Sequence, residues 1–590
     1  MHHLPRLLFS ALVLAAMAVS ASAASTIRVP ADHPTISAAI ADAQDGDVIL
    51  VSPGVYPEQI DFSGKNIVIR SITGPETTIL DGQGLHTVVL FVGGEGPSAR
   101  LDGFTVRNGR GVEVEYAGGI WCRNSSPTIA NCIITGNYGW TAMTGGPGGA
   151  GGIGSERGSI TVEGCVIESN FAGDGIDGAG GIAFERAGYY LYGPGVVIRD
   201  CVIRFNHGGD ITTVGSAGAG GIYCGYAAAV IADCTIAENH GGNLPVDGIG
   251  GSIGIGGIDC QSSEVQVLRC RILSNQGGSD LNGDGSQDGG EGGILFKNSP
   301  SFHPHGFSGL TNSVIAWNQG GRGDHDGGTG GVLIHRQQIH VSNCAIVGNT
   351  GGPGGAVGGL ETTSLTGHYA MTTLTNTLFW HNEGLARPNN FANANGTGPI
   401  MSNLLMGTDP GLVDPANGDF HLTCNSPAID AGTDTAPGLP QRDIDREPRL
   451  IGAQVDIGPD EFLAPAAAYC QANPNSTGAA AHICGQGSRS IAENDFTVNV
   501  DGLPNTPGML MYGPAQVQLS FGDGFRCVGG AVRRLAPMSA TASSISIDIN
   551  LANLPLMAGV QANFQYWYRD PMAGGSGFNL SDGLSVDFLQ

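Results

Sequence analysis

The chain has 590 residues, a formal net charge of −26 and 98 glycines. Nucleic acids need a cationic protein surface, so we expect no nucleic-acid partner, and an anionic polysaccharide would also be repelled unless metal ions bridged it to the protein. Glycine at this level without a period of three indicates disorder, unless a longer repeat accounts for it.

The amino terminus has the features of a secretory signal peptide. A basic start that ends at Arg6 precedes an apolar run over Leu7–Val19, and the small residues Ala21–Ala23 follow. We therefore predict a signal peptide over residues 1–23 and a secreted or cell-surface protein. No later run reaches the roughly 18 apolar residues of a transmembrane helix.

Short elements follow the signal peptide. Residues 35–41 have the pattern of a short amphipathic helix that would cap the end of a repeat domain. Residues 48–51, 67–70 and 77–80 are predicted strands between glycine and proline turns.

Two sets of anchors then recur along the chain. The first is Gly-Gly followed by an aliphatic residue, beginning at Gly118, Gly151, Gly180, Gly220, Gly256, Gly292, Gly330 and Gly358. The second is asparagine, at Asn137, Asn170, Asn206, Asn239, Asn275, Asn318, Asn349 and Asn382. Near-constant spacing with short alternating runs predicts stacked rungs of strands, in which asparagine tolerates left-handed turns and bonds to the next asparagine.

The sequence thus predicts an all-β chain. Residues 25–462 form a single-stranded right-handed parallel β-helix with a short N-terminal cap helix, residues 463–468 a linker, and residues 469–590 a small C-terminal β-sandwich-like module.

Several motifs resemble those of known families. Residues 29–36, 45–47, 53–58 and 79–82 are similar to the first rungs of pectin-lyase-like β-helix proteins. The repeats resemble the Gly-Gly-apolar and x-x-Asn repeats of polymorphic outer-membrane proteins, and residues 413–458 resemble the closing rungs of bacterial secreted β-helix proteins. These resemblances imply a fold and leave the function open.

The final module resembles carboxy-terminal modules of secreted proteins from environmental bacteria. The segments that carry the likeness are residues 469–484, 521–527, 567–570 and 578–581. This resemblance implies a bridge between Cys470 and Cys484, with Cys527 as an odd thiol among the 13 cysteines.

The segments from each asparagine to the next Gly-Gly vary in length and carry many acids, so we expect one acidic loop edge. The loop Asp280–Glu291 matches the EF-hand calcium pattern. Its predicted ligands are Asp280, Asn282, Asp284, Ser286, Asp288 and Glu291. The alternative is a solvated Gly/Asp loop that matches by composition.

Cysteines ten residues apart recur in three rungs: Cys122 with Cys132, Cys224 with Cys234, and Cys260 with Cys270. Each pair is predicted either to form a disulfide within its rung or to belong to columns of buried thiols. Tyr189, Tyr190 and Tyr192 in an insertion are predicted either to stack on sugar rings or to pack against the rung wall.

Two functions fit the sequence. The favoured one is a monomeric secreted or cell-surface scaffold that binds calcium and a polysaccharide, cell-surface glycan or surface partner along its acidic edge. The alternative is a calcium-dependent polysaccharide lyase or glycoside hydrolase, with Arg199 and Arg204 among the candidate bases of a lyase. The motifs of pectin methylesterases and polygalacturonases are absent.

Overall fold

A computed structural model describes residues 24–141, 149–174, 178–187, 195–210, 217–244, 253–281, 288–297, 308–323, 326–363, 372–384, 389–394, 399–462, 467–487, 490–491, 494, 496–541, 543–551 and 561–588. The predicted signal peptide lies outside these residues. In the part of the chain that is described, no helix has the length and hydrophobicity needed to cross a membrane.

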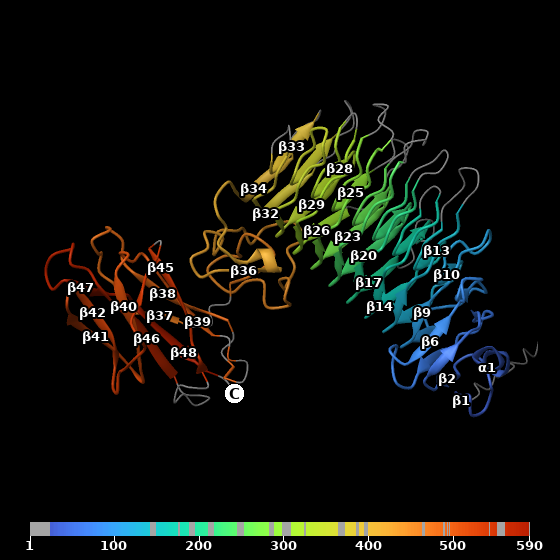
Figure 1. The fold of residues 1–590 in the computed structure, drawn as a ribbon, viewed down its shortest axis with the longest axis horizontal. Coiled ribbons are helices and arrows are strands. Elements are labelled where there is room, and N and C mark those ends of the chain that lie inside the picture. Colours follow the sequence, from blue (N-terminus) through green and yellow to red (C-terminus); the bar gives the residue numbers. More distant parts are fainter. Residues whose placement is uncertain are drawn as a thin grey trace, which may run out of the picture.

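The first unit is a right-handed parallel β-helix whose coils each contribute strands to three parallel columns. Figure 1 shows the strands stacked in one curved array from α1 to β33. The first column contains β1 (Thr26–Val29), β2 (Val48–Val51), β5 (Val68–Ser71), β8 (Arg100–Asp102), β11 (Thr128–Ala130), β14 (Thr161–Glu163), β17 (Val196–Arg199), β20 (Ala228–Ala232), β23 (Glu264–Leu268), β26 (Ser308–Thr311) and β29 (Ile339–Ser342).

The second column joins the first in one 23-stranded sheet. It contains β3 (Gly54–Tyr56), β6 (Thr78–Asp81), β9 (Thr105–Arg107), β12 (Ile133–Thr135), β15 (Val166–Glu168), β18 (Val202–Arg204), β21 (Thr235–Ala237), β24 (Arg271–Leu273), β27 (Val314–Ala316) and β30 (Ala345–Val347). The long strands β32 (Thr373–Trp380) and β34 (Ile400–Met406) complete both columns.

The third column is a separate 11-stranded sheet. It contains β4 (Ile60–Asp61), β7 (Val89–Phe91), β10 (Ile120–Arg123), β13 (Ile153–Glu156), β16 (Ile182–Glu185), β19 (Ile222–Gly225), β22 (Ile258–Gln261), β25 (Ile294–Lys297), β28 (Val332–His335), β31 (Leu360–Thr363) and β33 (Phe391–Ala394). Each Gly-Gly pair immediately precedes a strand of this column, as in Gly152 before β13.

Stacked aliphatic side chains fill the interior, because a single coil cannot bury its own apolar face. In the third column, for example, Ile153, Ile182 and Ile222 lie in register and are fully buried. The cap helix α1 (Ile36–Asp42) covers the first coil with Ile36 and Ile40, and the Thr35 side chain accepts a hydrogen bond from the Ala38 N–H. The predicted cap helix is confirmed.

The repeated asparagines form the predicted ladder. The side-chain amide of Asn206 donates to Asn239 Oδ1 at 3.0 Å, and Asn239 donates in turn to Asn275 Oδ1 at 3.0 Å. Each also donates to a carbonyl of another coil, as Asn239 does to Ile203 O at 2.9 Å. Since these side chains are almost fully buried, the ladder satisfies polar groups that would otherwise be costly to bury.

The Gly-Gly pairs are required by close backbone approach rather than by unusual dihedral angles. A Cβ on Gly152 would lie 2.5 Å from Gly181 O, and one on Gly221 would lie 2.5 Å from Gly257 O. Both contacts are with backbone atoms of the next coil, which cannot rotate away.

Residues 407–462, the closing segment, leave the coil after β34 and pack against the outer face of the last coils. The segment contains β35 (Leu412–Asp414), the 3-10 helix η1 (Pro415–Asn417) and β36 (Asp419–Leu422). Leu412, Phe420 and Ile457 join Val347 and Leu378 in one buried cluster. The segment therefore covers the second column near its end.

The terminal module has its own core and two main sheets. The larger contains β37 (Ala467–Tyr469), β40 (Pro507–Gly513), β43 (Arg533–Arg534), β44 (Met538–Ser539), β46 (Gln561–Arg569), β47 (Phe578–Leu580) and β48 (Gly583–Asp587). The smaller contains β38 (His482–Gln486), β39 (Thr497–Asp501) and β45 (Ser544–Asp548), and a two-stranded ribbon contains β41 (Ala515–Phe521) and β42 (Gly524–Gly529).

Side chains from both main sheets, such as Val498 and Phe564, share one core, which makes the module sandwich-like. The last two residues of the predicted linker, Ala467 and Ala468, belong to β37.

Candidate functional site

The predicted calcium loop is described only at its two ends. Asn282, Asp284 and Ser286 lie outside the described residues, while Asp280 and Glu291 are buried and Asp288 is exposed. The pKa of Glu291 is raised to about 8, mainly by burial and to a smaller extent by the charges of Asp259 and Glu361. The described ends do not form a group of three ligands within metal-binding reach, so calcium binding in this loop stays a prediction.

Tyr189, Tyr190 and Tyr192 also lie outside the described residues. A different set of rings is exposed along the β-helix. Tyr138, Phe171, His207 and His240 stack in successive coils with centroid separations of 5.0, 6.2 and 4.8 Å. Tyr138 and Phe171 are exposed, so part of this stacked column lies at the surface.

The six paired cysteines of the repeats do not form the predicted intra-rung disulfides. Cys122, Cys224 and Cys260 lie on the third column, whereas Cys132, Cys234 and Cys270 lie in turns between the first and second columns. All six are buried free thiols. The second set forms a column with Cys165 and Cys201 in which sulfurs donate to turn carbonyls, as Cys234 does to Ala232 O at 3.1 Å. The alternative of stacked thiols is therefore the one observed.

The bridge expected between Cys470 and Cys484 is wrong. Cys470 pairs with Cys527, with Cα atoms 6.0 Å apart, and Cys484 pairs with Cys424, with Cα atoms 6.2 Å apart. Cys470 follows β37 and lies beside β42, while Cys484 on β38 lies beside the closing segment. The second bridge thus joins the closing segment to the terminal module, and sequence reasoning missed it because nothing marked Cys424 as a partner.

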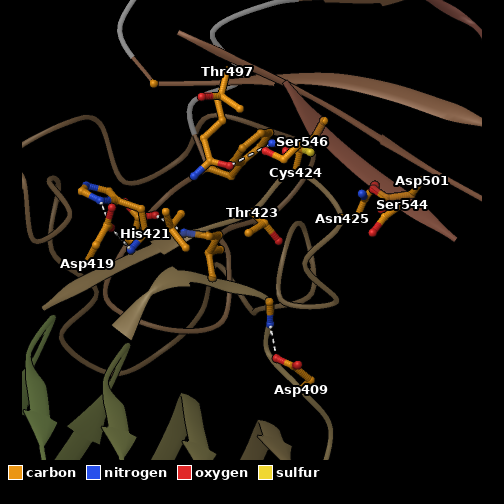
Figure 2. A pocket seen from close by; sticks show the side chains of 18 of the residues that line it. Asp409, Asp419, His421, Thr423, Cys424, Asn425, Thr497, Asp501, Ser544 and Ser546 are labelled. Carbon is orange, nitrogen blue, oxygen red and sulfur yellow. Dashed lines mark hydrogen bonds and ion pairs between the residues drawn. The ribbon is translucent and has the colours of Figure 1, made fainter. Parts of the chain in front are cut away.

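A cleft of about 980 Å³ lies between the closing segment and the smaller sheet of the module. Figure 2 shows Asp419 and His421 on one side of it, and Thr497, Ser546 and Asp501 on the strands opposite. Eight carboxylic acids line it: Asp409, Asp419, Asp445, Glu447, Asp460, Glu461, Asp501 and Asp548. Among the described lining residues, His421 is the sole basic side chain.

His421, Asp445 and Asp460 form the centre of the cleft. One imidazole nitrogen or carboxylate oxygen from each lies within 4.8 Å of the others, and this is the one such group of three among the described residues. His421 Nδ1 contacts Asp419 Oδ1 at 2.6 Å, and its Nε2 contacts Asp445 Oδ2 at 3.1 Å. The hydrogen bond to Asp445, the charge of Asp460 and the hydrogen bond to Asp419 raise the pKa of His421 to about 10.

Backbone donors hold the acids in place. Asp443 Oδ1 accepts the N–H groups of Asp445 and Glu447 at 3.0 and 2.8 Å, which fixes the loop that carries both. Asp460 is 5% exposed, and its Oδ2 accepts the Leu422 N–H at 3.0 Å. Burial raises the pKa of Asp460 to about 6 and that of Glu461 to about 8.

Arginines behind the cleft compensate part of this charge. Arg271 on β24 contacts Asp445 Oδ1 at 2.9 Å, and Arg449 contacts Glu461 Oε1 at 3.2 Å with both side chains almost completely buried. Neither arginine lines the cleft. A divalent cation that binds here must displace a proton from His421, because only a neutral imidazole binds a metal ion. The carboxylates around it supply oxygen ligands, which suit Ca²⁺ or Mn²⁺.

The candidate lyase bases are engaged elsewhere. Arg199 pairs with Glu163 and Arg204 with Glu168, in both cases on the outer face of the 23-stranded sheet. A general base must be free to take a proton from its substrate. These two arginines therefore belong to ion pairs on the outer face of the β-helix.

No protein-family model matches the chain, and no curated protein matches it. Among solved structures, the chain is similar to one described as the crystal structure of pectate lyase Pel9A. The two share 12% identity with a TM-score of 0.39, and the match covers 75% of this chain and 97% of that one. At this level the likeness supports no functional argument.

Proposed function

We propose that this protein is a secreted or cell-surface β-helix scaffold that binds a divalent cation in the cleft and, through that cation, an acidic glycan. The observation that supports the proposal is the meeting of His421, Asp445 and Asp460 in a cleft lined by six further carboxylic acids. The β-helix supplies the rigid support, and the closing segment supplies the ligands.

Electrostatics favours a cation there. Carboxylates that share one concave surface repel one another and attract positive ions. An acidic polysaccharide has the same sign as the cleft, so it needs a bridging ion to bind. The predicted calcium site at Asp280–Glu291 would extend this behaviour to the loop edge, and calcium remains the ion proposed for it.

Thermal unfolding with and without added ions tests the proposal. The protein is first treated with a chelator, and Ca²⁺ and Mn²⁺ are then added in separate titrations. Because an ion that binds only the folded state stabilises it by about 2.7 kcal/mol at 100 times its Kd, the unfolding midpoint should rise for at least one ion.

The variant Asp445→Asn/Asp460→Asn should lose that rise. Glu113→Gln is the matched control, since Glu113 is an exposed acid outside the cleft. A midpoint that responds to neither ion, or that responds equally in the double variant, would contradict cation binding in the cleft. Retention of an acidic polysaccharide that disappears with chelator would support the bridging role.

One observation supports the enzymatic alternative. Glu291 is buried, its pKa is raised to about 8 mainly by burial, and the charges of Asp259 on β22 and Glu361 on β31 act on it in the same direction. A glycoside hydrolase requires a protonated acid and an ionised carboxylate. If the protein is a hydrolase, a polysaccharide screen should yield new reducing ends, and Glu291→Gln should abolish them without unfolding the protein.

A further inference from the structure

We infer that His207 and His240 form a second metal site on the β-helix wall, one that takes a borderline transition-metal ion such as Cu²⁺, Ni²⁺ or Zn²⁺. The site is independent of the acidic cleft. It is built from two stacked imidazoles in successive coils.

The two rings are nearly parallel, with centroids 4.8 Å apart and an interplanar angle of 5°. They occupy equivalent positions, since each immediately follows a ladder asparagine. The backbone is fixed on both sides: the His207 N–H donates to Asn170 O and the His240 N–H donates to Asn206 O, both at 2.9 Å. The side chains therefore leave the wall from a rigid support.

Each ring contacts a carbonyl oxygen of its own backbone through Nδ1. His207 Nδ1 contacts Gly208 O at 2.7 Å, and His240 Nδ1 contacts Gly241 O at 2.6 Å. Because a carbonyl oxygen only accepts, each Nδ1 carries the hydrogen and each neutral ring keeps its lone pair on Nε2. This is the arrangement that orients metal-binding histidines, whose second nitrogen commonly donates to a carbonyl or carboxylate.

Neither Nε2 atom has a hydrogen-bond partner among the described residues, and both side chains are partly exposed. Two metal–nitrogen bonds of about 2.0–2.1 Å span at most about 4.2 Å, so the rings must tilt toward each other to share one ion. Their partial exposure allows this. Solvent then fills the remaining coordination positions.

A pair of imidazoles binds transition-metal ions in preference to Ca²⁺. A site of two neutral nitrogens follows the order in which Cu²⁺ binds more tightly than Ni²⁺ or Zn²⁺, and it offers little to Ca²⁺, which prefers oxygen. This difference separates the wall site from the cleft.

The test is a calorimetric titration of the full chain with Cu²⁺ and, separately, Ni²⁺, in a His421→Asn background that removes the imidazole of the cleft. His240→Gln should weaken Cu²⁺ binding by at least 10-fold, and His207→Gln should do the same, because each removes one of two ligands. His86→Gln is the matched control: His86 Nδ1 makes the same type of contact, with Thr87 O at 3.0 Å, but its ring stacks on no described imidazole.

A second variant guards against a folding effect. His240→Phe preserves a stacked ring beside His207, as Phe171 does on the other side at 6.2 Å, and lacks Nε2. It should keep the unfolding midpoint and lose the Cu²⁺ affinity. Equal Cu²⁺ affinity in the background, His240→Gln and His240→Phe proteins would overturn the inference.

Discussion

Acidic side chains have opposite environments in the wall of the β-helix, meaning its stacked coils up to β34, and in the closing segment. On the wall, Glu163 lies between Arg100 and Arg199, and these arginines outweigh burial and hold the pKa of Glu163 below its usual range. In the closing segment, Asp460 and Glu461 are buried, and burial raises the pKa of both. A regular repeat can pair charges between neighbouring coils, whereas the irregular segment concentrates acids that a ligand can use.

The largest loss of stability from a single substitution should lie in the closing segment. Arg449→Met should destabilise the protein by about 3–5 kcal/mol, because it removes the partner of the buried Glu461 and the donor used by the carbonyls of Asp456 and Gly458. Guanidinium-chloride unfolding measures the change. If Arg449→Met/Glu461→Leu is as unstable as the single variant, the loss of the donor to the two carbonyls, and not the unpaired Glu461, is the cause.

The wall should be most sensitive at its asparagine ladder. Asn239→Ala removes the acceptor used by Asn206 and the donor used by Ile203 O and Asn275 Oδ1, so we expect a loss of about 2–4 kcal/mol. Asn417→Ala, in which an exposed amide loses only its contact with Asp414, should cost less than about 0.5 kcal/mol. Similar losses for the two variants would refute the structural role of the ladder.

The two regions should also respond to pH with opposite signs. Wall carboxylates with lowered pKa stabilise the folded state above about pH 4, and that contribution disappears as the pH falls. Asp460 has a raised pKa, so its contribution to folding stability is fully present below pH 3.8, the pKa of an unfolded aspartate. That contribution, about 3 kcal/mol at most, is lost as the pH rises to about 6.

His421 adds a further loss of stability in the closing segment as the pH rises. Its raised pKa favours folding below about pH 6.5, and this contribution fades as the pH rises toward 10, by about 1 kcal/mol after allowance for the exposure of the ring. Hydrogen exchange of the Leu422 amide should therefore quicken relative to wall amides between pH 5 and pH 9, after correction for the intrinsic rate. A constant ratio would show that the regions do not differ.

The smallest loss of stability should come from weakening the ion pairs of Glu163. Glu163→Gln weakens the contacts with Arg100 and Arg199, and because these arginines are partly exposed we expect a loss of about 0.5–1 kcal/mol that shrinks in high salt. Glu113→Gln again serves as the control. A salt-independent loss would point to packing rather than charge.

The repeat made the wall predictable from sequence. Gly-Gly and asparagine at regular spacing indicated the stacked coils, and the ladder bonds of Asn206 and Asn239 are those expected of that position. The cap helix was found because its apolar spacing is local and periodic. The boundaries of some predicted strands are displaced: the strand predicted over residues 77–80 is observed one residue later, as β6. Spacing alone does not determine at which residue strand pairing begins.

The cleft was not predictable in the same way. His421, Asp445 and Asp460 are spread over 40 positions without a repeat, and the irregular path of the closing segment brings them together. The partner of Cys484 was missed for the same reason, because Cys424 lies in a different unit. Local patterns specify strands and turns, but they do not specify which irregular segments meet.

The most direct test of the cation cleft is an anomalous difference map from a crystal of the full chain soaked in MnCl₂. We expect a peak bounded by His421, Asp445 and Asp460 that is missing in Asp445→Asn/Asp460→Asn. A map from well-diffracting crystals with no peak in the cleft, whether or not the Asp280–Glu291 loop is occupied, would contradict the account.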